Sequence, residues 1–319
     1  MNAPGVALFA GDVSLDTTTV VDHVPEPDEK VHASALVEDV GGVVANAAIA
    51  CCLAGSPVAL LATFGADLAG TTCRALLRQR GVALRTADGR GTTSRALITL
   101  DSQGEKRLVL AAGASIYPDE LTCRDANLGD VTWLHTAVYD LVGAALLVSR
   151  CRAAGVRWSL DLEPATLREG LDPLRPCLDG ATTVFVNARA AALLGDAPTD
   201  ALFAAGVAQV VYTLGALGAR LHTVDRHTVV DPTALPGPVV DTTGAGDCLA
   251  GTYVAGLLLG RDPVGALQHA VAAASLSCCR LGGPASYPAP AEVSAKLGET
   301  VPGTAPVVAA KPAAGERNS

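Results

Sequence analysis

Short, strongly apolar runs alternate along the chain with longer segments in which apolar residues recur at helical spacing. The runs hold few polar residues, which is typical of strands buried on both faces of a sheet. The runs that predict strands are Val6–Ala10, Val58–Phe64, Val131–His135, Val156–Asp161, Thr183–Val186 and Gln209–Thr213. Segments such as Leu68–Arg80 and Leu141–Ala153 lie between them and predict helices. The alternation indicates an α/β fold with a mainly parallel central sheet that helices cover on both faces.

Two further pairs of strands are predicted by runs that are rich in β-branched residues but more polar than the core strands. The first pair, Thr17–Val24 and Val31–Val37, encloses a proline-containing turn. The second pair, Arg95–Leu100 and Arg107–Ala111, encloses Asp101–Gly104. Such polar strands cannot be buried on both faces, so we expect them at the surface. They form either one small sheet, which we favour, or two unrelated hairpins.

Polar residues follow the predicted core strands at their carboxyl ends. Parallel sheets bind ligands beyond these ends, so the residues there are candidates for a site. The candidates are Asp12, Asp16, Asp161, Glu163, Asn187, Thr213 and Asp241.

The most informative stretch is VVDTTGAGDCLAG at Val239–Gly251, where a short strand is followed by a helix-periodic run. Small residues at such a turn let backbone N–H groups converge on one point, and the helix dipole adds partial positive charge. Gly244, Ala245 and Gly246 therefore indicate an anion site that a phosphate can approach closely. Asp247 lies in the same turn, where a carboxylate can accept a proton from a hydroxyl group. The alternative is an ordinary acidic residue in the first turn of a helix.

Composition and charge limit the partners that the protein can have. The chain of 319 residues has a formal net charge of −9, which argues against nucleic acid and membrane surfaces as partners. Apolar residues make up 50% of the chain and aromatic residues 3%, so the core must consist mainly of aliphatic side chains. The nine cysteines show no CxxC pair and no metal-ligand spacing with the six histidines. This pattern favours reduced cysteines in a cytoplasmic protein.

The uncharged segment Val43–Ala66 is long enough to suggest a membrane span. Gly55, Ser56 and Pro57 divide it into a short helix and a short strand, so we expect no span. The N-terminus has no basic segment followed by an apolar run, so we expect no secretory signal.

The string DTTGAGD at Asp241–Asp247 resembles the second signature of the ribokinase-like (PfkB) family of sugar kinases. The resemblance extends from about Val6 to Pro288. It implies a three-layer ribokinase-like fold and an ATP-dependent sugar kinase that uses Mg²⁺, with Asp247 as the general base. It also implies that the two polar strand pairs form a small β-sheet, the lid, over the sugar. The lid often serves as the dimer interface in this family, so we expect a homodimer.

The resemblance also implies a domain organisation. We expect a kinase domain at residues 1–290, with the lid strands inserted at about residues 15–38 and 92–112. Residues 291–319 are rich in Ala, Pro and Val without periodicity, and we expect a C-terminal tail that is disordered near Val301–Ser319.

The first half of the chain resembles the sugar-binding part of the family. The string GGVVANAA is similar to the first signature, in which the glycines bring the backbone close to the sugar and Asn46 offers its amide to a hydroxyl group. The family often has a second Asn where this chain has Val43. The substrate-binding residues that the resemblance implies are Asp12, Asp16, Gly41, Gly42, Asn46 and Asp247. Taken alone, two glycines before a helix would indicate a simple turn.

The nucleotide-binding part of the family has its counterpart in the second half of the chain. The residues that the resemblance implies for it are Asn187, Thr213, Gly215, Gly218, Gly244 and Gly246. Asn187 begins the family's N-x-x-E motif, whose Glu helps to order magnesium and phosphates, but Ala190 stands at the Glu position, as in the ketohexokinase branch. Glu163 is either a substitute that binds the water shell of Mg²⁺ or a solvated residue at a strand end. The glycine spacing of TLGALG, without the resemblance, also fits a hairpin turn.

In many family members, the loop after the second long helix and the Asp-Thr of the signature bind a monovalent cation such as K⁺. The corresponding residues here are Asp241, Thr243 and Ser286. Oxygen ligands of this kind cannot be identified from sequence alone.

The identity of the substrate is the least determined part of the prediction. The string VVDHVPEPDEK, together with GGVVANAA and the missing Glu, resembles the ketohexokinase and sulfosugar kinase branch. We therefore expect a ketohexose, a fructose-like or a ribose-like sugar. An anionic sugar would need a basic anchor, for which Lys30, Arg95 and Arg107 are candidates. A nucleoside kinase of the same family is the alternative enzyme, but few aromatic residues are present to stack on a base. Val43 and Ala190 also suggest a non-catalytic sugar- or nucleotide-binding relative, although a pure binder has no need of Asp247.

Overall fold

A large sheet forms the middle layer of the protein, whose computed structural model describes residues 5–102, 106–114 and 116–299. Within these residues the sheet has nine strands. In spatial order they are β13 (His227–Val230), β12 (Ala219–His222), β11 (Val210–Thr213), β10 (Thr183–Asn187), β9 (Arg157–Leu162), β8 (Val131–Ala137), β1 (Val6–Ala10), β4 (Val58–Phe64) and β5 (Ala83–Asp88). Neighbours from β11 to β5 pair in parallel, and only β12 and β13 pair antiparallel at the edge. The predicted mainly parallel sheet is confirmed.

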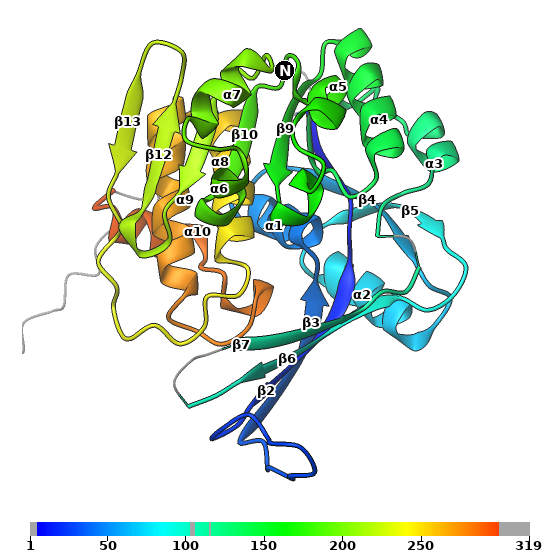
Figure 1. Cartoon of the computed structure of the whole chain (residues 1–319), viewed down its shortest axis with the longest axis vertical. Coiled ribbons are helices and arrows are strands. Elements are labelled where there is room, and N and C mark those ends of the chain that lie inside the picture. Colours follow the sequence, from blue (N-terminus) through cyan, green and yellow to red (C-terminus); the bar gives the residue numbers. More distant parts are fainter. Residues whose placement is uncertain (1–4, 103–105, 115, 300–319) are drawn as a thin grey trace, which may run out of the picture.

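Helices cover both faces of this sheet, as Figure 1 shows. In chain order the helices of the described residues are α1 (Val43–Leu53), α2 (Leu68–Gln79), α3 (Glu120–Asp125), α4 (Leu141–Ala154), α5 (Arg175–Leu178), α6 (Ala188–Leu193), α7 (Pro198–Ala204), α8 (Ala245–Leu258), α9 (Pro263–Ser277) and α10 (Pro290–Lys296). Successive side chains of a strand point to opposite faces. Ala7 and Phe9 therefore pack with α1, α2, α8 and α9 in one core cluster, and Leu8 and Ala10 pack with α3 to α7 in the other.

The lid is a separate sheet that projects from one end of the molecule (Figure 1). Its strands, in spatial order, are β3 (Ala35–Gly41), β2 (Ser14–Val20), β6 (Ser94–Leu100) and β7 (Lys106–Ala111). The predicted single small sheet is confirmed, whereas the predicted bounds of its first two strands are displaced. Residues 21–34 form a long loop instead of continuing the ladder, because Pro25 and Pro27 have no N–H group to donate to it. β3 consequently extends to the glycine pair at the start of α1.

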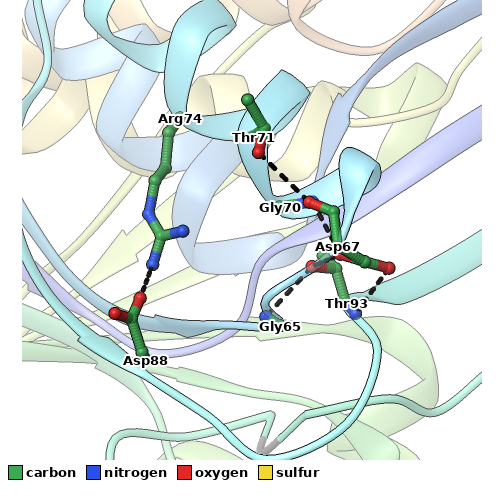
Figure 2. Close-up of polar contacts among 7 residues, drawn as sticks. All are labelled: Gly65, Asp67, Gly70, Thr71, Arg74, Asp88 and Thr93. Atoms are coloured by element: carbon green, nitrogen blue, oxygen red, sulfur yellow. Dashed lines mark hydrogen bonds and ion pairs between the residues drawn. The ribbon is translucent and has the colours of Figure 1, made fainter.

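Two polar contacts hold the base of the lid to the body of the protein. Asp67, the N-cap of α2, accepts hydrogen bonds from Gly70 N at 2.9 Å and from Thr93 Oγ1 at 2.7 Å, as Figure 2 shows. Thr93 lies just before β6 and is almost fully buried. On the other hairpin, Arg80 Nη2 at the end of α2 donates to Asp39 Oδ2 of β3 at 2.7 Å. Both lid hairpins are thus attached to α2.

The folded part of the chain extends beyond the predicted boundary at residue 290. Helix α10 occupies the beginning of the segment that was predicted to be a tail, and its Val293 is buried in the same core cluster as α8 and α9. The prediction of a disordered tail from residue 291 is wrong for this helix, and Val301–Ser319 lies outside the described residues. Among the residues described, no helix is long and apolar enough to cross a membrane.

Candidate functional site

The glycine-rich turn forms the N-terminus of α8. Gly244 is the N-cap residue, with φ of 72°, and Asp247 lies in the first turn of the helix. A side chain at Gly244 would meet the hydroxyl oxygen of Tyr287 at 2.7 Å, whereas a Cβ atom at Gly246 would enter open space. The N–H groups of a first helical turn have no acceptor within the helix. The open side of the turn is therefore a site where an anion can approach backbone donors beside the Asp247 carboxylate.

Asn46 lies directly beside this carboxylate. Its Nδ2 donates a hydrogen bond to Asp247 Oδ2 at 2.8 Å, and its Oδ1 is buried without a partner in the described structure. The two side chains meet because α1 and α8 pack very closely. A Cβ atom at Gly251 of α8 would lie 2.1 Å from the carbonyl oxygen of Ala47 in α1. Asn46 is thus fixed at one end and retains an unused acceptor at the other, which is suited to a ligand hydroxyl.

Asp12 and Asp16 have structural contacts as well as a place in the site. Asp12 accepts hydrogen bonds from the N–H groups of Val43 and Val44 at 2.9 and 3.0 Å, so it caps α1. Asp16 accepts a hydrogen bond from Ser14 Oγ at 2.5 Å. The Asp16 carboxyl group fills the space beside Gly41, where a Cβ atom would lie 2.0 Å from its Oδ2. Gly41 is therefore required by the packing of Asp16 and not only by a turn.

Buried negative charge accumulates between the sheet and α8. Burial is the main cause that raises the pKa of Asp247 to about 8 and the pKa of Asp12 to about 6, and the charge of Glu163 raises both further. Burial also raises the pKa of Asp161 well above its usual value, and the charges of Glu163, Asp247 and Asp12 add to this effect. These four carboxyl groups therefore influence one another. Together they form a site in which a cation would relieve electrostatic repulsion.

The donor set of this cluster fits Mg²⁺, which prefers carboxylate and water oxygens. Asp161 is the second-last residue of β9, Glu163 directly follows the strand, and β9 is the neighbour of β10 in the sheet. In the described residues, no group of three or more His, Cys, Asp or Glu side chains is disposed to enclose a metal ion. The chain therefore offers scattered carboxylates, and the remaining ligands of a metal ion would have to come from water and phosphate.

Asn187 and Thr213 end neighbouring parallel strands and are paired in register. The Asn187 side chain caps α6, because its Oδ1 accepts a hydrogen bond from Ala190 N at 2.9 Å. Ala190 itself is fully buried. The following loop contains Gly215 and Gly218, both with positive φ, and a Cβ atom at Gly218 would lie 2.2 Å from the carbonyl oxygen of Val230. The close approach of the backbone at the end of β13 thus explains Gly218, while open space surrounds Gly215.

Asp241 connects the glycine-rich turn to the loop that follows α9. Its Oδ1 accepts hydrogen bonds from Thr243 N at 2.9 Å and Thr243 Oγ1 at 2.6 Å, and its Oδ2 accepts one from Gly282 N at 3.0 Å. Ser286 in the same loop donates to the carbonyl oxygen of Gly283 at 2.7 Å. The three residues predicted to bind a monovalent cation therefore lie on two adjoining loops, with side chains engaged in hydrogen bonds.

The predicted basic anchors do not face the site. Strand register places Arg95 and Arg107 on the lid face opposite to Asp16, because Asp16 pairs with Ala96, and Arg107 pairs with Thr99. Lys30 is exposed in the long loop at the tip of the lid. The structure instead brings Lys106 of β7 to the site, where its Nζ donates to Thr243 Oγ1 at 3.2 Å.

Sequence reasoning missed three residues that belong to this site. They are Lys106, Tyr139 and Tyr287. The pKa of Tyr139 is raised by burial and by the charges of Asp12 and Glu163, so this ring lies beside the carboxylates. The Tyr287 hydroxyl group donates to the carbonyl oxygen of Gly244 at 2.9 Å and fixes the turn. Of the three, only Lys106 belongs to a recognisable sequence pattern, because it alternates with Leu108 and Leu110 along β7 and so shares one face with them.

Comparison with known proteins identifies the family. A model of the pfkB family carbohydrate kinases matches residues 8–290. The chain belongs to the pfkB family of carbohydrate kinases. An ATP-dependent ribose-1-phosphate kinase of Halopiger xanaduensis is 32% identical over 300 residues, which cover 92% of this chain and 98% of that protein. A ribokinase of Haemophilus influenzae is 26% identical over 292 residues, 87% of this chain and 94% of that protein.

Solved structures support the same assignment. The crystal structure of ribokinase from Cryptococcus neoformans var. grubii in complex with ADP is 26% identical, with a TM-score of 0.72 over 92% of this chain and all of that chain. The predicted ribokinase-like fold with its lid is therefore confirmed. As a pfkB carbohydrate kinase, the protein is a phosphotransferase with an alcohol group as acceptor.

Proposed function

We propose that this pfkB kinase transfers the γ-phosphoryl group of ATP to a hydroxyl group of a small sugar, with Asp247 as the general base. The observation that carries the proposal is the position of Asp247. Its carboxylate is held by Asn46 and lies in the turn whose backbone N–H groups can bind a phosphoryl group. Proton acceptor and anion site are thus adjacent, as phosphoryl transfer to an alcohol requires.

The sugar would lie between the lid and the carboxylates of the body. Asp12, Asp16 and the Oδ1 atom of Asn46 are acceptors for its hydroxyl groups, and Gly41 and Gly42 let the backbone approach it. One hydroxyl group loses its proton to Asp247, and its oxygen then attacks the γ-phosphorus of ATP. The bond from this phosphorus to the β–γ bridging oxygen breaks, and ADP leaves. The amides of Gly244, Ala245 and Gly246 bind the charge that develops on the transferred group.

The nucleotide would lie across the ends of β10 and β11. Asn187, Thr213 and Gly215 face its phosphates in this proposal, and open space at Gly215 and Gly246 allows close approach. Mg²⁺, when bound, would supply positive charge that offsets the charge of the phosphates. Glu163 would accept hydrogen bonds from its water shell in place of the Glu that Ala190 replaces.

Two further parts of the proposal concern ions and assembly. Asp241, Thr243 and Ser286 would support a K⁺ ion on the loops beside the turn. Two copies of the chain would pair through their lids. The protein would act in the cytoplasm, where its nine free cysteines stay reduced.

The substrate is a neutral ketohexose or pentose in this proposal, because acidic side chains line the pocket. A phosphorylated sugar is a second candidate, since one relative is named as a ribose-1-phosphate kinase. The decisive experiment measures ADP release from MgATP with a panel of sugars. The panel includes ribose, fructose, ribose 1-phosphate, 2-dehydro-3-deoxygluconate and adenosine. Turnover with a sugar supports the proposal, turnover with adenosine alone favours a nucleoside kinase, and no turnover with any compound favours a non-catalytic binder.

A further inference from the structure

We infer that Lys106 of the lid is a catalytic residue that binds the phosphoryl group being transferred, so that the lid supplies a cation to the reaction. The inference rests on the proposed kinase function and adds a residue to it. It starts from one contact, the hydrogen bond of 3.2 Å from Lys106 Nζ to Thr243 Oγ1. This contact joins β7, at the far edge of the lid, to the glycine-rich turn 137 residues later in the chain.

The register of the lid fixes the direction of the Lys106 side chain. Lys106 pairs with Leu100 of β6, and Leu100 pairs with Val20 of β2. Paired residues of neighbouring strands point to the same face, and residues two apart along a strand share that face. Lys106 is therefore on the face that carries Asp16, which faces the site. The charge of Lys106 acts on the carboxyl groups there, because it lowers the pKa of both Asp16 and Asp247 against the larger effect of burial.

The hydrogen bonds around Thr243 leave the ammonium group able to bind an anion. Thr243 Oγ1 donates its proton to Asp241 Oδ1 at 2.6 Å, so it must accept the hydrogen bond from Lys106. An ammonium group has three N–H donors, and this contact uses one of them. Thr243 immediately precedes Gly244, the N-cap of the helix whose first turn forms the anion site. The Lys106 cation thus lies next to the turn that carries the backbone donors.

A phosphoryl group at this point explains why a lysine is placed there. The other titratable groups that act on Asp247 are acidic, namely Glu163 and Asp12. They repel the γ-phosphate of ATP, and a cation on the lid offsets this repulsion while the phosphoryl group moves from ADP to the sugar oxygen. The hydroxyl proton goes to Asp247.

The test compares Lys106→Gln with wild type in nucleotide binding and in turnover. Calorimetry with AMP-PNP, ADP and adenosine requires no knowledge of the sugar. We expect the affinity for AMP-PNP to fall about 10- to 100-fold, the range for losing a hydrogen bond to a charged group, and the affinity for adenosine to stay unchanged. In turnover, kcat/KM for ATP should fall by a similar factor, and Lys106→Arg should recover part of it.

Arg107→Gln is the matched control, because it removes the same charge from the next residue of β7 on the opposite face of the lid. An AMP-PNP affinity of Lys106→Gln within twofold of wild type would overturn the inference. A defect confined to the KM for the sugar would also overturn it, because Lys106 would then bind the sugar and not the phosphoryl group. Failure of the kinase proposal looks different, since wild type itself would then show no turnover with any sugar.

Discussion

The amide of Asn46 donates a hydrogen bond of 2.8 Å to the carboxylate of Asp247, although 201 residues separate them in the chain. The contact depends on the close approach of α1 and α8, which Gly251 permits. It holds one oxygen of the Asp247 carboxylate in place. Asn46 therefore orients the proposed base as well as offering its own oxygen to the sugar.

Replacing Asp247 tests the proposed base. We expect Asp247→Asn to keep the fold and most of the affinity for ATP, but to lose about 100-fold or more in kcat, because a positioned general base contributes at least this much. Steady-state kinetics with the sugar identified by the panel provides the measurement. Asp262→Asn is the control, since Asp262 caps α9 with the same side chain away from the proposed site. A near-normal kcat in folded Asp247→Asn would contradict the mechanism.

The raised pKa of Asp247 predicts that the free protein loses stability as the pH rises. Folding raises this pKa from its usual 3.8 to about 8, mainly through burial. Between about pH 4 and pH 8, the folded state still holds this proton while the unfolded state has released it, so a rise in pH favours the unfolded state. The free energy of unfolding therefore falls from about pH 4 and levels off above about pH 8. Asp12 and Asp16, with pKa values of about 6, add to the same trend.

Thermal unfolding at pH 5.5 and pH 8.5 measures this effect. We expect Asp247→Asn to have a higher Tm than wild type at pH 8.5, and a smaller difference between the two pH values. For a chain of 319 residues, the Tm should rise about 1.5 °C for each kcal/mol regained. Identical pH dependence in the two proteins would show that Asp247 does not carry the buried charge.

Glu163 is predicted to replace the missing Glu of the metal site. Glu163→Gln should raise the Mg²⁺ concentration for half-maximal rate by about 10-fold, the usual lower range for a lost outer-shell partner. The KM for the sugar should change little. The measurement is a Mg²⁺ titration at saturating sugar and fixed total ATP, with Glu169→Gln as a control on the same connecting segment. If the Glu163→Gln curve overlays the wild-type curve, Glu163 has no role in Mg²⁺ binding and is only a solvated residue at the end of a strand.

The lid is predicted to join two copies of the chain. Leu36, Leu97 and Val109 share the lid face that points away from Asp16, and they are 63%, 51% and 62% exposed. Apolar side chains in such number on one small sheet favour a covered face. We expect a dimer in analytical ultracentrifugation at micromolar concentration and a monomer for Leu97→Glu. Val142→Glu, at an equally exposed position on α4, should stay dimeric. A monomeric wild type would refute the prediction.

The sequence predicted the layers of the fold because the core strands and helices differ so clearly in hydrophobic period. It did not predict β5, β12 or β13: β12 and β13 have only four residues each, and β5 is largely exposed or half-buried. The start of the helix after the glycine-rich turn was predicted correctly, because small residues and an acidic residue are typical of a helix N-terminus that binds an anion. The short strand predicted to end at Val239 and Val240 is wrong, since these residues are exposed and belong to no strand. The direction of Arg107 and Lys106 was not predictable, since a change of one residue in register exchanges the two faces of a strand.

Other contacts of the site depend on tertiary packing and leave no local pattern. Tyr287 supports Gly244 from a loop 43 residues further along the chain, and no spacing rule connects them. Asp12 was expected as a sugar ligand, but its capping of α1 appears only when β1 and α1 are placed together. Gly41 was expected to bring the backbone close to the sugar, and the structure shows in addition that the space it leaves is filled by Asp16.

The path of the chain through the lid makes this small sheet inseparable from the pocket beside it. β3 ends at Gly41, directly before the glycine that begins α1, while β2 carries Asp16 and β7 carries Lys106. A minimal version of the protein without the lid would therefore lose two side chains of the proposed site together with the proposed dimer interface. For the same reason, a chimaera that received the lid of another kinase would inherit some of the donor's substrate preference.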